Sequence, residues 1–368
     1  MPVYESALGW VDDLFALFGR TPPPNLNLYI ALTTILIPVP ILIMFLRNAR
    51  PRFASIPPYR ERVLILGATS GVGEELAYQY AARGCRNIVL VGRRGKELER
   101  VKEKCAEKRK EGEEWDQSQQ APGWEDVGET VHIVEADCTK PEDLVKVRQV
   151  VRRALGGLDT LHITFGVSAL RPLLNLAGVD PLTQTASSSS SPHATLEGIT
   201  NVLSKASQIH NINAAATAAV LATFIPLLQL TSPLPTIVLL SSVAAYVPPP
   251  TRSLYGASKA AQLHVFQAVA VESAAQSERS TPKRSEIAFL AMAPATIRTS
   301  FRQSAIDGVP GEELKDAAWD DAKSKGSSEI LEASEVARRS IKCADRGEKG
   351  IVAMPVKYRI VRWIYPLM

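Results

Sequence analysis

A serine pair followed by a tyrosine and a lysine forms the strongest chemical pattern in the chain. Ser241 and Ser242 end an apolar run, and Tyr255 and Lys259 follow within the sequence YGASK. A spacing of four places Tyr255 and Lys259 on one helical face, one turn apart. Tyrosine, with its usual pKa near ~10, transfers protons poorly at pH 7, and a neighbouring ammonium lowers that pKa. The pattern predicts a proton-transfer site in which Ser242 hydrogen-bonds a substrate carbonyl.

A glycine-rich turn supplies a second chemical signal. Gly67, Gly71 and Gly73 follow the apolar run Arg62–Leu66 and open a helical stretch. Glycines permit positive φ and let the backbone approach a pyrophosphate at a helix N-terminus. A plain strand-to-helix turn is the alternative interpretation. The dinucleotide interpretation also assigns to the cofactor the turn residues Thr69, Ser70 and Val72.

Charged side chains follow the next two apolar runs. Arg93 and Arg94 come after the second run, where an acidic residue would bind a ribose 2′-hydroxyl and a basic one accommodates a 2′-phosphate. These arginines therefore favour NADP(H) over NAD(H), with a solvated basic helix start as the alternative. Asp137 and Cys138 follow the third run, and we expect them at the adenine.

The elements that must position these residues are short apolar runs alternating with helical stretches. Such runs predict parallel strands covered on both faces, and right-handed crossovers then give a Rossmann-type, doubly wound α/β fold with a seven-stranded parallel sheet. The predicted strands are Arg62–Leu66, Asn87–Val91, Val131–Glu135, Leu158–Phe165, Thr236–Leu240, Ile287–Met292 and Gly350–Met354. The predicted helices include Glu74–Arg83, Lys96–Glu114 and Pro141–Leu155.

Over roughly residues 60–355, these motifs resemble the short-chain dehydrogenase/reductase family. The resemblance implies that Tyr255 is the general acid/base, that Lys259 binds the nicotinamide ribose and lowers the tyrosine pKa, and that Ser242 orients the carbonyl. It adds Asn213, which precedes Pro226 by 13 residues, as a fourth catalytic residue. It also places at the cofactor, beside Tyr255 and Lys259, the residues Gly166, Pro294, Ile297 and Thr299.

Three departures from the family pattern indicate a divergent branch. Leu66 replaces the usual threonine before the first glycine, Thr164-Phe165-Gly166 replaces N-A-G, and Ala295 replaces the glycine of P-G. None of these positions carries a proton-transfer group.

An uncharged run of 19 residues, Leu28–Leu46, is about long enough to span a ~30 Å hydrocarbon core. Pro38 and Pro40 in its middle leave a kinked span and a hairpin open, with a buried core helix as the other alternative. A basic cluster follows, and the positive-inside rule then places the catalytic domain in the cytosol. The cluster consists of Arg47, Arg50, Arg52, Arg60 and Arg62.

The predicted organisation is a tail (1–24), a membrane anchor (25–50) and a catalytic domain (60–355) that carries polar inserts at 112–129 and 178–195. An apolar-basic extension (356–368) follows. The net charge of +4, without a basic block, argues against a nucleic-acid partner. Four scattered cysteines and no H-E-x-x-H predict no metal site.

We expect an NADP(H)-dependent oxidoreductase that interconverts a ketone or aldehyde and an alcohol on a lipophilic substrate. Similar anchored family members act on steroids, retinoids, sphingoid or long-chain 3-keto lipids. The resemblance also implies a homodimer, and an endoplasmic reticulum or lipid-droplet membrane. The alternatives are a non-catalytic NADP-binding membrane scaffold and a lumen-facing dehydrogenase.

Overall fold

The computed structural model describes residues 52–115, 131–179, 193–308 and 330–358. The chain divides into two compact units, Met1–Pro51 and Arg52–Met368, and the described residues belong to the second. The predicted tail and anchor lie outside the described residues, as do most of both inserts and most of the C-terminal extension.

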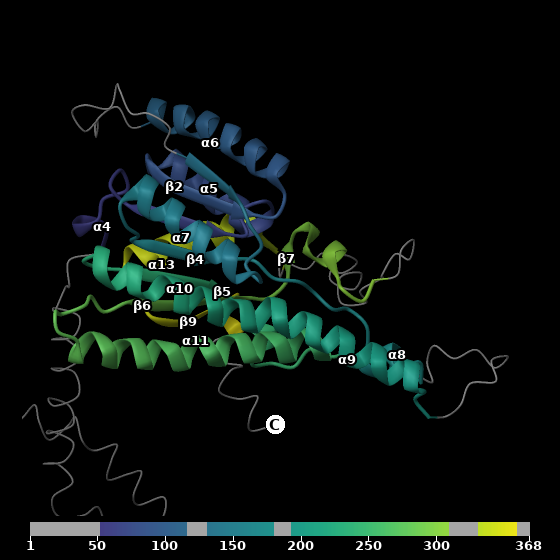
Figure 1. The fold of residues 1–368 in the computed structure, drawn as a ribbon. Helices are drawn as coiled ribbons and strands as arrows, with labels where there is room; N and C mark the ends of the chain where they lie inside the picture. The colour runs from purple at the N-terminus through teal and green to yellow at the C-terminus, as the bar shows by residue number, and fades with distance from the viewer. Residues whose placement is uncertain (1–51, 116–130, 180–192, 309–329, 359–368) are drawn as a thin grey trace, which may run out of the picture. The chain divides into compact units, whose positions relative to one another are not determined.

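Seven parallel strands form the sheet, in the order β3-β2-β1-β4-β5-β6-β9, so the predicted doubly wound fold is confirmed (Figure 1). β1 lies at the centre and pairs with β2 on one side and β4 on the other. A short second sheet pairs β7 (Ile297–Arg298) with β8 (Leu331–Glu332). The strands of the main sheet are β1 (Arg62–Leu66), β2 (Asn87–Gly92), β3 (Val131–Glu135), β4 (Thr160–Ile163), β5 (Thr236–Leu240), β6 (Ala288–Pro294) and β9 (Gly350–Met354).

The helices lie between the strands and cover both faces of the sheet (Figure 1). The α-helices are α4 (Arg52–Ser55), α5 (Gly71–Ala82), α6 (Gly95–Trp115), α7 (Pro141–Leu155), α8 (Leu173–Leu176), α9 (Leu196–His210), α10 (Ala216–Thr231), α11 (Ser253–Arg279) and α13 (Ala333–Asp345). The shorter turns are the π-helix η3 (Asn211–Ala215) and the 3-10 helices η4 (Val243–Ala245) and η5 (Ser300–Ser304).

Alternate side chains of each strand point into two separate hydrophobic cores. On β1, Val63 and Ile65 join the core beneath α5, α6 and α13, whereas Leu64 and Leu66 join the core beneath α7, α10 and α11. All four are fully buried. Burial on both faces explains why the strands appear in the sequence as continuous apolar runs.

Several predicted boundaries were wrong by one to three residues; β4, for example, runs over Thr160–Ile163 instead of Leu158–Phe165, and β6 over Ala288–Pro294 instead of Ile287–Met292. The first helix begins at Gly71 instead of Glu74, because the first backbone N–H groups of a helix need no intrahelical partner and a glycine there costs little. The charged helix α6 continues to Trp115, so residues 112–115 of the predicted insert are helical.

Two arginines of the predicted basic cluster form ion pairs within the described part of the chain. Arg52 is 4% exposed and contacts Glu61, while Arg62 binds Asp159 through two hydrogen bonds of 2.8 Å. Their charges are neutralised locally, so they add less to an inside-positive bias than the sequence suggests.

Among the described residues, one helical run is long and apolar enough to cross a membrane by length and composition. It is Leu196–Thr231, and 50% of its most apolar window is buried. Within it, α10 packs Phe224 and Leu228 into the core, as the core helix of a globular domain does. The run therefore says nothing about the predicted anchor.

Candidate active site

A cavity of about 890 Å³ opens at the carboxyl ends of the strands. Its walls come from the segments that follow β1, β2, β3, β4 and β5 and from the end of β6, at the edge where open α/β sheets hold ligands. The fold thus brings together most of the predicted site residues. Those that line the cavity are Gly67, Thr69, Ser70, Gly71, Val72, Arg93, Arg94, Asp137, Cys138, Gly166, Ser242, Tyr255, Lys259, Pro294, Ile297 and Thr299.

The turn after β1 leaves no room for a side chain at Gly67 or Gly73. A methyl group on Gly73 would lie 2.2 Å from the carbonyl oxygen of Gly67, and one on Gly67 would lie 2.7 Å from the backbone nitrogen of Phe165. Gly67 and Gly71 also adopt positive φ, +92° and +60°. Close backbone packing at the start of a helix fits a dinucleotide pyrophosphate, so these residues fit a nicotinamide cofactor.

Thr164 supports this turn from the end of β4. Its hydroxyl donates to the carbonyl oxygen of Leu66 at 2.8 Å and contacts that of Gly67 at 3.2 Å. A hydroxyl at this position binds the turn directly, so the departure from N-A-G leaves the glycine cradle intact.

Two basic residues and an ionised carboxylate line the cavity beyond β2 and β3. Arg94 donates to the Thr69 hydroxyl at 2.9 Å and to the Ser70 hydroxyl at 3.2 Å, which holds its guanidinium beside the glycine turn. Burial raises the pKa of Asp137, but hydrogen bonds from Thr139 and the charge of Arg93 outweigh it and lower the pKa. Cys138 is partly buried, and burial raises the pKa of its thiol, which therefore stays protonated at neutral pH.

The end of β6 forms the opposite wall. Pro294 ends the strand, and Ile297 pairs with Leu331 in the small sheet. Thr299 caps η5, where its hydroxyl accepts from the backbone nitrogen of Phe301 at 3.4 Å, and its methyl group faces Gly71. All three lie where the P-G-x-x-x-T resemblance predicts cofactor contacts.

Tyr255 lies in the cavity and is 7% exposed. The predicted low pKa was wrong: burial raises the pKa of this phenol, although the charge of Arg252, a hydrogen bond with Ser242 and the charge of Arg302 oppose the shift. The Ser242 hydroxyl caps η4 by accepting from the backbone nitrogen of Ala244 at 3.1 Å.

The Lys259 ammonium lies 3% exposed between two oxygens. It donates to the carbonyl oxygen of Leu240 at 3.1 Å and to the Gln262 side-chain oxygen at 2.9 Å. Burial lowers its pKa to about 8, so the ammonium stays mostly charged at pH 7. A methyl group on Gly166 would lie 3.6 Å from Nζ and 3.1 Å from the Asn213 amide oxygen, so the backbone there approaches both side chains closely.

Asn213 and Gly73 are the two predicted site residues that do not line the cavity. Asn213 lies fully buried in the π-helical turn η3. Its amide binds both the backbone nitrogen and the carbonyl oxygen of Val167, at 2.9 and 3.0 Å, and donates to the Ser258 hydroxyl at 2.9 Å. It joins the segment between β4 and α8, called the β4 loop below, to α11, the helix that carries Tyr255 and Lys259.

Three cavity residues near Tyr255 are not among the predicted site residues, although the sequence hypothesis that the segment near Arg298–Leu314 borders the substrate mouth covers two of them. Arg252 packs its guanidinium over the tyrosine ring at 4.3 Å, and Phe301 meets that ring edge-on at 6.0 Å. Arg302 lies beside Phe301 in η5. For Arg252, its position three residues before Tyr255 was the one available signal.

Comparison with known sequences identifies relatives among dehydrogenases. The short chain dehydrogenase family model matches residues 61–309. The 11-beta-hydroxysteroid dehydrogenase A of Sesamum indicum is 28% identical over 82% of this chain and 70% of its own length. The 11-beta-hydroxysteroid dehydrogenase 1A of Arabidopsis thaliana is 31% identical over 58% of this chain, and the match spans about half (48%) of that relative.

Solved structures share the fold at low sequence identity. A short chain dehydrogenase/reductase from Burkholderia phymatum in complex with NAD aligns with a TM-score of 0.57 at 18% identity, covering 83% of this chain and 94% of that one. An alcohol dehydrogenase from Thermococcus sibiricus complexed with 5-hydroxy-NADP aligns with a TM-score of 0.54 at 16% identity, covering 80% and 95%. These neighbours include both NAD and NADP complexes.

Proposed function

The chain belongs to the short-chain dehydrogenase/reductase family of oxidoreductases acting on CH–OH groups, and on this premise we propose that it is an NADP(H)-dependent enzyme for a lipophilic carbonyl/alcohol pair. One observation carries the proposal: a single cavity holds Ser242, Tyr255 and Lys259 beside a glycine turn shaped for a pyrophosphate. Hydroxysteroids are the first substrate class to test, because the relatives bear that name.

A nicotinamide cofactor held at the glycine turn and by Lys259 would supply or accept the hydride. The chain's own groups then have three tasks. Tyr255 gives a proton to the carbonyl oxygen in reduction and takes it from the alcohol in oxidation. Ser242 donates a hydrogen bond to that same oxygen, and the Lys259 charge favours the phenolate form of the tyrosine. Asn213 fixes the β4 loop against α11 and so positions the site.

The preference for NADP(H) rests on Arg93 and Arg94, since no carboxylate follows β2 at the place where a ribose 2′-hydroxyl would bind. Arg94 is held by Thr69 and Ser70, so its position is fixed before a 2′-phosphate arrives. A guanidinium fixed in this way donates strong, charge-assisted hydrogen bonds to a phosphate.

A carbonyl screen tests the proposal. Purified, detergent-solubilised protein is given NADPH or NADH with an 11-ketosteroid, retinal, 3-ketosphinganine and a 3-ketoacyl thioester, and nicotinamide absorbance is followed. We expect NADPH-dependent reduction of at least one compound and none with Tyr255→Phe. NADPH binding without any turnover would instead support the scaffold alternative, and a clear NADH preference would contradict the cofactor assignment.

We also propose that residues 25–50 anchor the chain in a membrane, with the catalytic domain facing the cytosol. The uncharged run Leu28–Leu46 and the basic residues after it support this. Protease added to intact microsomes should digest residues 60–368. Protection of that fragment would favour the lumen-facing alternative.

A homodimer is the expected assembly. Leu230 on α10 and Val271 on α11 are 61% and 73% exposed, which leaves apolar side chains on both helices available to a second copy. Light scattering of the solubilised protein should give twice the mass of one chain, and a monomer mass would contradict the assignment.

A further inference from the structure

Arg252 binds both the tyrosine and the loop opposite it. Its guanidinium carbon lies 4.3 Å from the centre of the Tyr255 ring. One terminal nitrogen donates to the Ser168 hydroxyl at 2.7 Å, and Nε approaches the carbonyl oxygen of Ala169 at 3.4 Å. Ser168 and Ala169 are at most 1% exposed, so the guanidinium is attached to a buried part of the β4 loop.

The backbone before Arg252 adopts an unusual conformation. Thr251 has φ of +65°, the one positive value at a non-glycine residue within the described part of the chain. A β-branched side chain disfavours this region, and such strain is retained where the surrounding structure requires it. Arg252 directly follows Thr251 and directly precedes the first residue of α11. The conformation of Thr251 therefore sets where the Arg252 side chain enters the cavity.

Positive charge predominates around the phenol. Arg252 lies just before α11 and Lys259 lies within it, Arg302 comes from η5, and the uncharged Ser242 hydroxyl faces the ring from the end of β5. Among the described lining residues, Asp137 is the one carboxylate, and it follows β3, which β2, β1 and β4 separate from β5. The Lys259 ammonium is already shared between two neutral oxygens.

We propose that Arg252 is a positioning residue for Tyr255. Its guanidinium holds the phenol ring against the β4 loop at Ser168 and supplies positive charge that favours the phenolate form of Tyr255. The guanidinium is charged in both protonation states of the tyrosine, whereas the ring carries negative charge only as phenolate. The contact therefore strengthens when the proton leaves. Burial opposes ionisation of Tyr255, and Arg252 is the main charge that counteracts it.

This inference rests on the proposed function, since it requires Tyr255 to exchange the substrate proton. Alcohol oxidation needs the phenolate, so kcat/KM falls as the pH drops through the tyrosine pKa. Removing the guanidinium raises that pKa. In a plot of kcat/KM against pH, the acidic limb, where kcat/KM falls with decreasing pH, then moves to higher pH. A charge within 4–6 Å typically shifts a pKa by about 1–3 units, and we expect about one unit from this partly buried arginine.

The experiment compares Arg252→Met with Arg252→Lys, which keeps the charge and loses the planar clamp. The probe is the alcohol oxidised fastest with NADP+ among an 11β-hydroxysteroid, retinol, sphinganine and a 3-hydroxyacyl thioester. Arg252→Met should move the acidic limb to higher pH by about one unit, so that kcat/KM at pH values below the tyrosine pKa is roughly tenfold lower. In Arg252→Lys the limb should stay within about a few tenths of a pH unit of the wild type. Thermal unfolding and NADPH fluorescence report folding and cofactor binding separately.

An unshifted limb in Arg252→Met, or an equal shift in Arg252→Lys, overturns the inference. If Arg252→Met does not fold, Ser168→Ala takes its place, because it removes the 2.7 Å anchor and should shift the limb in the same direction by less. Tyr255→Phe distinguishes a failure of the proposed function from a failure of the inference about Arg252. Retained oxidation in that variant, or no oxidation of any probe by the wild type, overturns the proposed function itself, whereas an inactive Tyr255→Phe with an unshifted Arg252→Met overturns this inference alone.

Discussion

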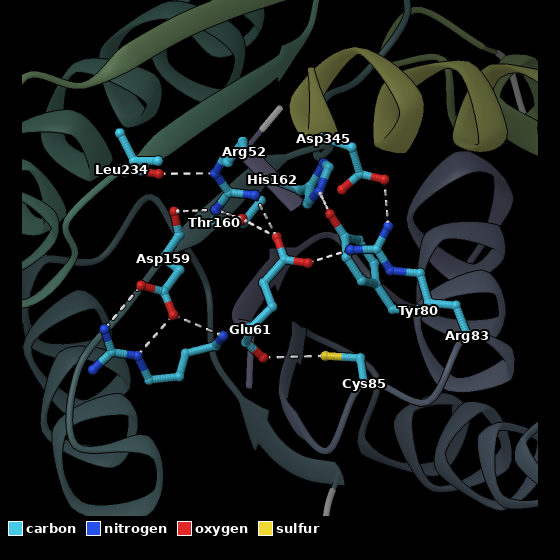
Figure 2. A network of polar contacts seen from close by, with 11 residues as sticks. Arg52, Glu61, Tyr80, Arg83, Cys85, Asp159, Thr160, His162, Leu234 and Asp345 are labelled. Carbon is cyan, nitrogen blue, oxygen red and sulfur yellow. Dashed lines mark hydrogen bonds and ion pairs between the residues drawn. The ribbon is translucent and has the colours of Figure 1, made fainter. Parts of the chain in front are cut away.

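At the amino ends of the strands, buried charges are paired with one another; at the carboxyl ends, they face a cavity. Glu61, before β1, is fully buried between Arg52 and Arg83 and also binds the Thr160 hydroxyl (Figure 2). Lys259, after β5, is buried almost as deeply but contacts only neutral oxygens, and the cavity lies beside it. One sheet thus carries two polar regions with opposite requirements.

The amino-end network is extensive and links distant parts of the sequence. Arg52 binds the carbonyl oxygens of Leu234 and Asp159, and Arg83 continues to Asp345 at 2.8 Å (Figure 2). Burial raises the pKa of Glu61, but the charges of Arg83 and Arg52 outweigh it and lower the pKa. In this protein, deeply buried charge lies at the candidate active site where it lacks a counter-ion and borders a cavity, whereas the paired charges at the amino ends stabilise the fold.

The largest stability effect is expected at Glu61. Glu61→Ala leaves two arginines without their carboxylate, and removing one partner of a buried ion pair costs about 3–5 kcal/mol. Urea unfolding should show this loss, while kcat/KM of the remaining folded protein is unchanged. Glu286→Ala is the matched control, because its pair with Lys349 is more than half exposed and should cost at most about 1 kcal/mol. A loss below about 1 kcal/mol in Glu61→Ala would remove the contrast between the two regions.

A second effect concerns acid stability and His162. Burial lowers its pKa to about 3, below the value near 6.5 of the unfolded chain, and its Nε2 lies 2.9 Å from the Tyr80 hydroxyl. The unfolded state therefore binds a proton that the folded state does not, and stability falls as the pH drops from 6.5 toward 3, by about 1.4 kcal/mol per pH unit.

Between pH 6 and 4.5, His162→Gln should lose about 2 kcal/mol less than the wild type. Urea unfolding at both pH values measures this difference. His264→Gln, at an exposed position, should follow the wild type. If the free energy of unfolding of His162→Gln fell with pH as steeply as that of the wild type, another titrating group would be responsible for the loss of stability in acid.

The smallest effect is expected at the carboxyl end. Arg94→Ala should weaken NADPH binding about tenfold, or ~1.4 kcal/mol, and leave NADH binding and unfolding almost unchanged, because Arg94 itself is exposed and its hydrogen bonds go to the neutral hydroxyls of Thr69 and Ser70. Fluorescence titration gives both affinities, with Lys96→Ala as the exposed basic control. An equal loss for both cofactors would contradict a 2′-phosphate role.

The sequence predicts the two regions unequally, for physical reasons. Strands buried on both faces are continuous apolar runs, and the glycine turn and YGASK motif are local, so the sheet could be predicted, and most of the predicted site residues do line the cavity. Glu61 meets Thr160 and Arg83 meets Asp345 across 99 and 262 residues, and no local pattern encodes such pairs. For the same reason Arg52 was assigned to a basic cluster, and the raised pKa of Tyr255 was missed because burial is a property of the fold.

A matched pair of tyrosines tests the central claim most directly. Tyr80 and Tyr255 are both buried, one in the amino-end network and one in the cavity, and Tyr→Phe removes the same hydroxyl from each. Single-turnover oxidation of NADPH with the best carbonyl probe should fall about a thousandfold in Tyr255→Phe with NADPH affinity intact, and stay within about twofold of wild type in Tyr80→Phe, which loses only about 1 kcal/mol of stability. Equal rates in the two variants would contradict the assignment of proton transfer to Tyr255.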